Sequence, residues 1–299
     1  MPMRIAVTGQ SGQVVLSMLE RAPEGVAVIP LGRPRLDLER LETIASALAA
    51  CKPDVIVNAA AYTAVDLAES QEETARLVNG AAAGEVAKAA ATLGIPVIQI
   101  STDYVFDGSL GRPYREDDAV APISAYGRGK LEGERSVAAA TSNHAILRTA
   151  WVYSPFGKNF VRTMLRLAQT RDEVGVVADQ VGCPTSALDI ADAIFAVARN
   201  LVELPHEPAL RGTFHMAAQG EAVWADVAAR IFAERELLGG TPVRVKRIMT
   251  SDYPTPARRP ANSRLDSSRL AETHGVRLPE WQGALATCVR RLLTNAQTG

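Results

Sequence analysis

The sequence of 299 residues predicts an α/β fold, in which a Rossmann-like, doubly wound parallel sheet precedes a smaller C-terminal α/β domain. Short apolar segments alternate with helical segments through the first half, and this repetition favours a parallel sheet with right-handed crossovers. The apolar segments are almost wholly hydrophobic, as expected for strands covered by helices on both faces. A glycine-containing turn also joins the first strand to the first helix, which is typical of nucleotide-binding sheets.

The elements of the first half follow in chain order. We expect strands at residues 5–7, 26–31, 54–57, 96–100 and 145–147, separated by helices at 14–20, 41–50, 72–93 and 125–140. The segment 72–93 is rich in Ala, Glu and Leu, which favour helices. Together these elements predict a first domain over residues 1–150.

The pattern loosens after residue 150. We expect helices at 160–169, 188–202 and 223–237, with short strands at 212–215 and 243–245. The proline- and arginine-rich stretch 254–262 is either a surface loop or a functional segment. Residues 151–299 are therefore predicted to form mainly a second, substrate-binding domain, with a segment near 178–203 returning to the first.

Composition excludes several classes of protein. Hydrophobic residues make up 47% and charged residues 22% of the chain, which argues against disorder. A net charge of -1 argues against a nucleic-acid or anionic-membrane binder, and no apolar run is long enough to span a membrane. Cys51, Cys183 and Cys288 lie too far apart for a zinc site or a disulfide framework, which fits a reducing compartment. Because the N-terminus does not read as a signal peptide, we expect a cytoplasmic protein.

The turn Gly9-Gln10-Ser11-Gly12-Gln13 directly follows the first strand and opens the first helix. Glycine permits the tight turn and lets the backbone approach a pyrophosphate, while the helix N-terminus supplies N–H donors and a partial positive charge. Residues 58–61 end the third strand in the same way, and their small side chains leave room for a cofactor ribose. These positions predict a dinucleotide site at the carboxyl ends of the strands.

Arg33 lies just past the second strand, where the adenosine ribose of a dinucleotide is expected. An acidic residue there would bind a ribose 2′-hydroxyl, whereas an arginine favours a 2′-phosphate. NADPH is therefore expected as the cofactor, with NADH as the alternative. The competing interpretation is that Arg33 and Arg35 are solvated loop charges. Asp37, the next carboxylate, is expected on the adenine side.

Tyr126 and Lys130 stand four residues apart on a predicted helix and therefore share one face. An ammonium beside a phenol favours the phenolate, so Lys130 is expected to lower the pKa of Tyr126 and make it a general acid near neutral pH. Thr102 ends the fourth strand, where its hydroxyl can hydrogen-bond both a substrate oxygen and the phenol. The alternative interpretations are an exposed helix pair and a strand-end cap.

Longer blocks of sequence surround these motifs. They read GQSGQ at 9–13, PDVIVNAAAYTAVDLAE at 53–69, STDYVFDG at 101–108, YGRGK at 126–130, RTAWVY at 148–153, GKNFVRTMLRLA at 157–168, DQVGCPTSALDIAD at 179–192 and YPTPARRPANSRLD at 253–266. Through these blocks the chain resembles the extended short-chain dehydrogenase/reductases, and more closely the dTDP-4-dehydrorhamnose reductases among them. The resemblance covers nearly the whole chain.

The resemblance implies a reaction and a set of residue roles. In that family, NADPH reduces the C4 ketone of dTDP-6-deoxy-L-lyxo-4-hexulose to give dTDP-L-rhamnose for cell-wall polysaccharide and O-antigen. Tyr126 matches the proton donor, Lys130 the residue that holds the nicotinamide ribose, and Thr102 the hydroxyl that tunes this pair. Positions matching cofactor contacts, added to Gly9 and Arg33, are Gly12, Gln13, Val14, Asp37, Leu38, Ala60 and Ala61. Positions matching the sugar site, besides Thr102, are Asp103, Tyr104 and Trp151.

Three arginines lie in the last of these blocks, at 253–266. Arg258, Arg259 and Arg264 could each meet the nucleotide diphosphate, and nothing in the sequence chooses among them.

Some family members bind magnesium at a dimer interface through three glutamates. The matching positions here are Ser17, Leu188 and Asn295, which lack the carboxylate oxygens that a hard cation needs. No metal is therefore expected, and a homodimer formed by that route is in doubt.

Two other functions of the same fold stay open at this point. A sugar-nucleotide epimerase or dehydratase would hold its cofactor tightly, so stoichiometric consumption of NADPH would separate a reductase from it. A non-catalytic regulatory subunit, similar to the beta subunit of methionine adenosyltransferase, is the other alternative. The intact Thr102, Tyr126 and Lys130 weigh against a non-catalytic subunit.

Overall fold

The structure is a computed structural model that describes residues 2–297, with side chains described as far as residue 294. Its main sheet has the strand order β10-β5-β4-β3-β1-β2, and every neighbouring pair is parallel. The strands are β1 (Met3–Thr8), β2 (Val26–Leu31), β3 (Val55–Asn58), β4 (Val97–Thr102), β5 (His144–Thr149) and β10 (Gly212–His215).

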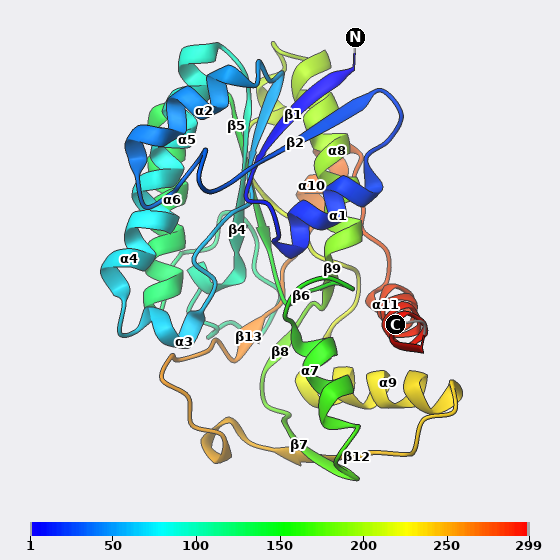
Figure 1. Cartoon of the computed structure of the whole chain (residues 1–299). Helices are drawn as coiled ribbons and strands as arrows, with labels where there is room; N and C mark the ends of the chain where they lie inside the picture. Colours follow the sequence, from blue (N-terminus) through cyan, green and yellow to red (C-terminus); the bar gives the residue numbers. More distant parts are fainter. Residues whose placement is uncertain (1, 298–299) are drawn as a thin grey trace.

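Helices cover both faces of this sheet (Figure 1). One face carries α2 (Ile44–Ala50), α5 (Ala82–Leu93) and α6 (Ala125–Ala140), and the other carries α1 (Gln13–Arg21), α8 (Ala187–Glu203) and α10 (Ser268–His274). Successive residues of a strand point to opposite faces, so Val55 and Val57 join one apolar core while Ile56 joins the other. The predicted doubly wound α/β fold is confirmed.

The chain reverses its progress across the sheet at β1, which lies between β2 and β3. The strand β1 leads into α1 on one face, whereas β3 leads toward α5 on the other face. Connections that diverge in this way leave a crevice beyond the carboxyl ends of the strands. The topology therefore places a ligand site next to the loops that follow β1, β3 and β4.

The C-terminal half contains a separate apolar core, which lies below the main sheet in Figure 1. Its elements are α7 (Phe160–Leu167), α9 (Trp224–Leu237), α11 (Trp281–Gln297) and a two-stranded sheet of β7 (Glu173–Val177) and β12 (Arg244–Ile248). Two further small sheets consist of β6 (Val152–Tyr153), β8 (Val181–Gly182), β9 (Thr185–Ser186), β11 (Ala222–Val223) and β13 (Asn262–Ser263). A domain boundary near residue 150 stays a prediction.

Segments of the C-terminal half also return to the main sheet. The helix α8 packs against α1, and β10 adds an edge strand beside β5. The sequence predicts a strand at 212–215. Four residues of mixed polarity do not indicate which sheet they will join, because the partner of a strand is set by tertiary contacts and register.

The helix predicted at 72–93 is interrupted in the structure. It consists of α4 (Glu72–Arg76), a π-helical segment at Leu77–Ala81, and α5. In the π-helical segment, Asn79 Oδ1 accepts a hydrogen bond from Tyr62 N at 2.8 Å, and Asn79 Nδ2 donates to Tyr62 O at 3.1 Å. A Cβ on Gly133 of α6 would come within 2.1 Å of Asn79 O, so glycine permits this close approach of the helices.

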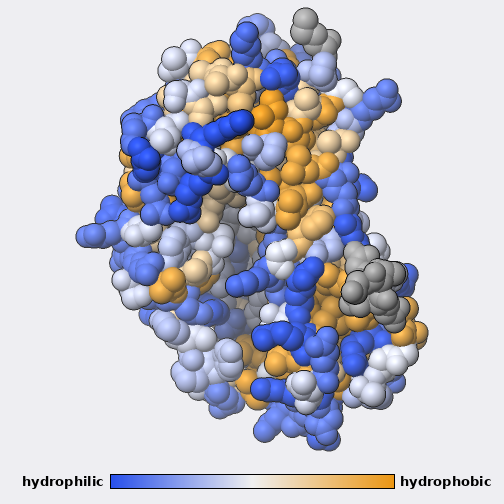
Figure 2. All heavy atoms as spheres, in the orientation of Figure 1, coloured by the Kyte–Doolittle hydropathy of each residue, from blue (hydrophilic) through white to orange (hydrophobic). Residues whose placement is uncertain are grey.

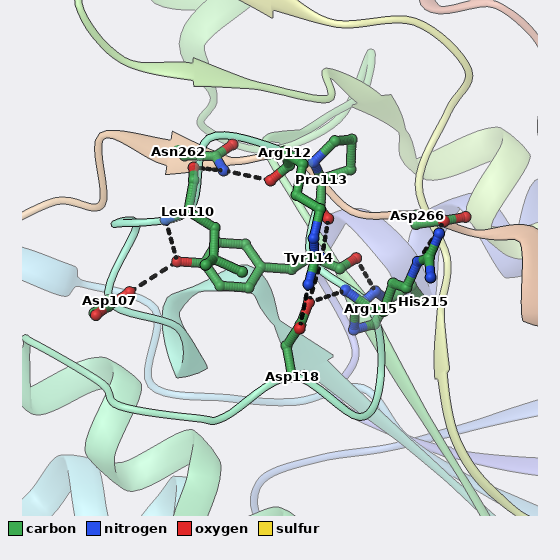
Figure 3. A network of polar contacts seen from close by, with 10 residues as sticks. All are labelled: Asp107, Leu110, Arg112, Pro113, Tyr114, Arg115, Asp118, His215, Asn262 and Asp266. Carbon is green, nitrogen blue, oxygen red and sulfur yellow. Dashed lines mark hydrogen bonds and ion pairs between the residues drawn. The ribbon is translucent and has the colours of Figure 1, made fainter.

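The loop at 106–118, which follows β4, is anchored to the C-terminal half by a polar network (Figure 3). Tyr114 Oη donates to Asp107 Oδ1 at 2.7 Å, and the Tyr114 carbonyl lies 3.0 Å from His215 Nδ1 on β10. Asn262 of β13 donates from Nδ2 to two carbonyls of the loop, at 2.6 and 2.8 Å. The network fixes the chain directly after the end of β4.

Candidate active site

A cavity of about 880 Å³ opens at the carboxyl ends of the main strands. Figure 2 shows the surface hollowed between the half of the molecule that holds the main sheet and the half that holds α7 and α9. Apart from the three candidate arginines of the segment 254–266, the structure brings the residues assigned above to catalysis, cofactor or substrate into the cavity wall. These are Gly9, Gly12, Gln13, Val14, Arg33, Asp37, Leu38, Ala60, Ala61, Thr102, Asp103, Tyr104, Tyr126, Lys130 and Trp151.

The glycine turn has the backbone that a close approach requires. Gly9 has a φ of +99°, which residues with a side chain rarely adopt. The helix α1 begins after Gly12, and no side chain caps its N-terminus, so its first N–H groups are available to an anionic ligand. Gln13 Oε1 accepts hydrogen bonds from Ser154 Oγ and Asn159 Nδ2, both at 2.9 Å. A loop of the C-terminal half therefore holds the glycine turn in place.

The ends of β1 and β3 are joined by a buried network that sequence reasoning missed. Thr8 Oγ1 donates to Asn58 Oδ1 at 2.7 Å and accepts from the backbone N–H groups of Ala59 and Ala60 at 3.1 and 3.0 Å. Asn58 Nδ2 donates to Gln99 Oε1 on β4 at 2.7 Å. The network sets the backbone of the small residues that line the cavity. In the sequence, the polar side chain of Gln99 inside an otherwise apolar strand is the feature that indicates such a network.

Arg33 lies at the cavity edge and remains largely in solvent, with 72% of its side chain exposed. Its Nε is 3.9 Å from Asp37 Oδ1, and its Nη1 is 3.7 Å from Glu39 Oε1. These are loose surface pairs, which are worth about 1 kcal/mol or less. Arg35 is exposed and lies outside the cavity wall. The two arginines therefore differ, and only Arg33 is placed to meet a ligand.

The catalytic candidates come from β4, α6 and the short 3-10 helix η3 (Asp103–Val105). Thr102 ends β4, where its Oγ1 accepts from Tyr104 N at 3.2 Å and donates to Asp103 Oδ1 at 2.9 Å. Tyr126 and Lys130 project from α6, and Lys130 Nζ donates to the Ile100 carbonyl at 2.6 Å. The side chain of Thr102 also acts on the pKa of Tyr126, and both residues line the cavity. Tyr126 and Lys130 therefore lie on one face of α6, as their four-residue spacing predicts.

The predicted lowering of the pKa of Tyr126 is not found, and Lys130 is not among the groups that shift this pKa. Burial raises the pKa of Tyr126, the charge of Asp103 adds to the rise, and the Thr102 side chain only partly opposes it. Lys130 is 4% exposed, and burial lowers its own pKa to about 8. Helical spacing shows that two groups share a face, but it does not show that both are buried. Burial disfavours the charged form of each.

Aromatic side chains gather on the substrate side of the cavity. The ring of Tyr104 lies edge-on to that of Tyr126, with centroids 5.5 Å apart. The indole of Trp151 stacks on that of Trp224, with centroids 3.6 Å apart and planes inclined by 8°. Sequence reasoning placed Trp224 only in a helix, so it missed half of this stack. It also left Lys158 of the cavity wall without a role.

The three candidate arginines for the nucleotide diphosphate differ in their contacts. Arg259 pairs with Asp66, at 2.8 Å for Nη2–Oδ2 and 3.0 Å for Nη1–Oδ1. Arg264 Nη1 lies 3.0 Å from Glu221 Oε2. Arg258 is exposed. None of the three belongs to the cavity wall, so the structure does not bring them to the predicted diphosphate position.

Within residues 2–297, no three His, Cys, Asp or Glu side chains are grouped so that they could hold a metal ion. Ser17 is buried and Leu188 is half-buried, while the side chain of Asn295 lies outside the described part of the chain. No helix in the described part is long and apolar enough to cross a membrane.

Fold and cavity together define a class of protein. A parallel sheet with a glycine turn after β1 is a dinucleotide-binding scaffold, and the same cavity wall holds a Thr–Tyr–Lys set suited to acid–base chemistry. This combination defines a nucleotide-dependent oxidoreductase of the short-chain dehydrogenase class.

Within that class, the chain belongs to the dTDP-4-dehydrorhamnose reductase family. Residues 3–294 match the family model described as the RmlD substrate binding domain. The chain is 51% identical over 291 residues to the dTDP-4-dehydrorhamnose reductase of Sinorhizobium fredii, covering 97% of this chain and 98% of the relative. It is 46% identical over 297 residues to that of Burkholderia thailandensis, covering 98% and 100%.

Solved structures agree with this assignment. A dTDP-4-dehydrorhamnose reductase from Clostridium acetobutylicum matches with a TM-score of 0.89 and 38% identity, covering 97% of this chain and 100% of that one. The Bacillus anthracis enzyme in complex with NADP matches with a TM-score of 0.89, 32% identity and the same coverage. A UDP-glucose 4-epimerase from Thermus thermophilus, at 20% identity and a TM-score of 0.78, shares the fold alone.

Proposed function

We propose that this chain reduces the C4 ketone of dTDP-6-deoxy-L-lyxo-4-hexulose to dTDP-L-rhamnose, with NADPH as the reductant. The observation that carries the proposal is the convergence of Thr102, Tyr126 and Lys130 on the cavity that also contains the glycine turn. Relatives at 46–51% identity bear the name of this reductase, and a solved relative contains NADP. The chain thus acts in dTDP-rhamnose biosynthesis.

The residues present fit a dinucleotide. A Cβ built on Gly12 would meet nothing within 4 Å, so open space adjoins the uncapped N-terminus of α1, where a diphosphate can accept N–H groups. Ala60 and Ala61 leave room for a ribose, and Arg33 is placed for a 2′-phosphate. When bound, NADPH supplies a hydride for the C4 carbon of the substrate.

Tyr126 is the proposed proton donor to the C4 oxygen. Its pKa is raised, so the phenol is protonated near neutral pH and holds the proton that it would deliver to the carbonyl oxygen. Thr102 lies in the same cavity wall and opposes part of the rise in the pKa of Tyr126, so its hydroxyl is proposed to orient the phenol. Lys130, with a pKa of about 8, is mostly an ammonium near neutral pH. That charge stabilises the phenolate which forms, and Lys130 also holds the nicotinamide ribose in this proposal.

The stacked Trp151 and Trp224 offer an apolar wall for the methyl face of a deoxysugar. Asp103 is 2% exposed, and burial raises its pKa to about 6. Asp103 also lines the cavity, next to Thr102, whose hydroxyl donates to its Oδ1. Tyr104 completes the proposed sugar site.

We also place the reaction in the cytoplasm, with a nucleotide sugar as the small-molecule partner. The support is that Cys51, Cys183 and Cys288 are free thiols, as expected in a reducing compartment. Formation of a homodimer stays a prediction that a measurement of molecular mass tests.

The test is to incubate the purified chain with NADPH and the keto sugar, and to follow NADPH absorbance together with the sugar product. We expect equimolar loss of NADPH and formation of dTDP-L-rhamnose. Conversion of the sugar without net loss of NADPH would instead indicate an epimerase or dehydratase. No turnover, with capture of a catalytic partner, would indicate a regulatory subunit.

A further inference from the structure

A buried ion pair lies beside the Thr–Tyr–Lys set. Glu134 of α6 and Arg148 of β5 are each 5% exposed. Arg148 Nε donates to Glu134 Oε1 at 2.9 Å, and Arg148 Nη2 donates to Oε2 at 2.7 Å. Ser101 Oγ adds a third hydrogen bond, to Oε1 at 2.5 Å. Removing two charges from water is costly, so such a pair is weak support for stability by itself and calls for another reason.

The sheet register places this cluster next to the site. The pairing of β4 with β5 sets Ser101 opposite Arg148 and Thr102 opposite Thr149. Thr102 and Thr149 both line the cavity. The ion pair therefore occupies the row of the sheet that adjoins the hydroxyls of the site, and Glu134 reaches that row from α6.

The helix places Glu134 one turn beyond Lys130. Tyr126, Lys130 and Glu134 follow one another at four-residue intervals on α6, so they share one face. Lys130 Nζ is held by the Ile100 carbonyl, an acceptor without a full charge. Burial lowers the pKa of Lys130, and the negative charge of Glu134 acts against that fall.

The other titratable or charged groups around this cluster do not replace Glu134. Asp103 of η3 accepts a hydrogen bond from Thr102 and acts electrostatically on Tyr126. Burial lowers the pKa of His215 on β10, next to Arg148, to about 3, so the imidazole is neutral near neutral pH. Tyr126 lies on the same helix, and the Arg148 cation of β5 is paired with Glu134 itself.

We propose that Glu134 is a positioning residue for Lys130. Held by Arg148 and Ser101, its carboxylate seats α6 on β4 and β5 and supplies the negative charge that keeps Lys130 an ammonium. The inference rests on the proposed function for the role of Lys130 in turnover. The effect of Glu134 on the charge of Lys130 can also be measured through cofactor binding alone, without turnover.

The test is Glu134→Gln, which keeps the size of the side chain and removes its charge. Without that charge Lys130 loses its proton at lower pH, so the alkaline limb of kcat/KM is expected to move down by about one pH unit. The pH dependence of NADPH affinity, followed by NADPH fluorescence, is expected to move in the same direction. Glu132→Gln is the matched control, because Glu132 lies on the same helix and makes an exposed pair with Arg76. Its two profiles should match those of the wild type.

A folded Glu134→Gln protein with wild-type profiles would overturn the inference. If that variant does not fold, Arg148→Met is added to it, because the double variant then does not leave the buried Arg148 guanidinium without its carboxylate partner. A smaller shift in the same direction is then expected, because the positive charge of Arg148 is removed together with the negative charge of Glu134, and an unshifted profile refutes the proposal. A wild-type chain that does not reduce the keto sugar contradicts the proposed function, whereas the NADPH-binding profiles still decide the role of Glu134.

Discussion

Gly127 is a position where the structure tolerates no side chain. A Cβ at this residue would lie 2.2 Å from the carbonyl oxygen of Tyr104 and 3.0 Å from Pro122 Cβ. Ordinary van der Waals contact begins near 3.4 Å. In Gly127→Ala, the distance between the new Cβ and Tyr104 O must therefore increase by 1.2 Å (3.4 minus 2.2). The obstacle is a backbone atom of η3 and cannot rotate away, so α6 and η3 must separate.

That separation acts on the catalytic geometry. Tyr126 precedes Gly127 on α6, and η3 directly follows Thr102, so the change pulls the phenol away from the hydroxyl. A misplacement of about 1 Å can cost about 100-fold in rate, and we expect kcat to fall by about that factor. Alanine favours a helix over glycine by about 1 kcal/mol, so intrinsic helix propensity does not oppose the variant. NADPH affinity, which we assign mainly to the glycine turn after β1, should change less.

The assay compares NADPH oxidation with the keto sugar, NADPH affinity and thermal unfolding for the wild type and two variants. Gly129→Ala is the control, because it makes the same exchange on the same helix while its nearest atom, Ala75 O, lies 3.3 Å away. It should keep kcat within about threefold of the wild type, since a shift of a few tenths of an ångström suffices. A folded Gly127→Ala protein with wild-type kcat would refute this reasoning.

Three further predictions follow from the site. Tyr126→Phe should bind NADPH normally and lose turnover by about 10²–10⁴-fold, as expected when general acid catalysis is removed; turnover within twofold of the wild type would remove Tyr126 as the proton donor. Arg33→Ala should weaken NADPH binding by about tenfold and spare NADH, because a charge-assisted contact in an exposed loop is worth about 1.5 kcal/mol. Equal kcat/KM for both cofactors before and after this change would contradict the assignment of Arg33. EDTA should alter neither rate nor molecular mass, because Ser17 and Leu188 supply no carboxylate; a magnesium-dependent loss of either would reveal a site that we have not identified.

The strands of the main sheet could be predicted closely because their signal is local. Strand β2 has the predicted bounds, and α6 also runs over the predicted residues 125–140. The strand β10 was predicted, but its place at the edge of the main sheet was not, since its partner β5 lies more than sixty residues earlier and nothing in the segment 212–215 encodes that pairing.

The interrupted helix at 72–93 shows a different limit. Its composition favours helix throughout, and the π-helical segment at Leu77–Ala81 coincides with contacts made from outside the helix. Asn79 is bonded to Tyr62, and its carbonyl faces Gly133 on α6. Helix propensity is a property of each residue by itself and does not depend on Tyr62 or Gly133, so it cannot locate the interruption.

The sequence by itself determined the α/β fold, the glycine turn after β1 and the shared face of Tyr126 and Lys130, because hydrophobic period and motif spacing are properties of neighbouring residues. Only the tertiary structure decided which of these groups are buried, and burial reversed the expected shift in the pKa of Tyr126. It likewise stacked Trp224 on Trp151 and paired Glu134 with Arg148. Burial and pairing depend on residues far apart in the chain, and these meet only when the sheet and its helices have packed.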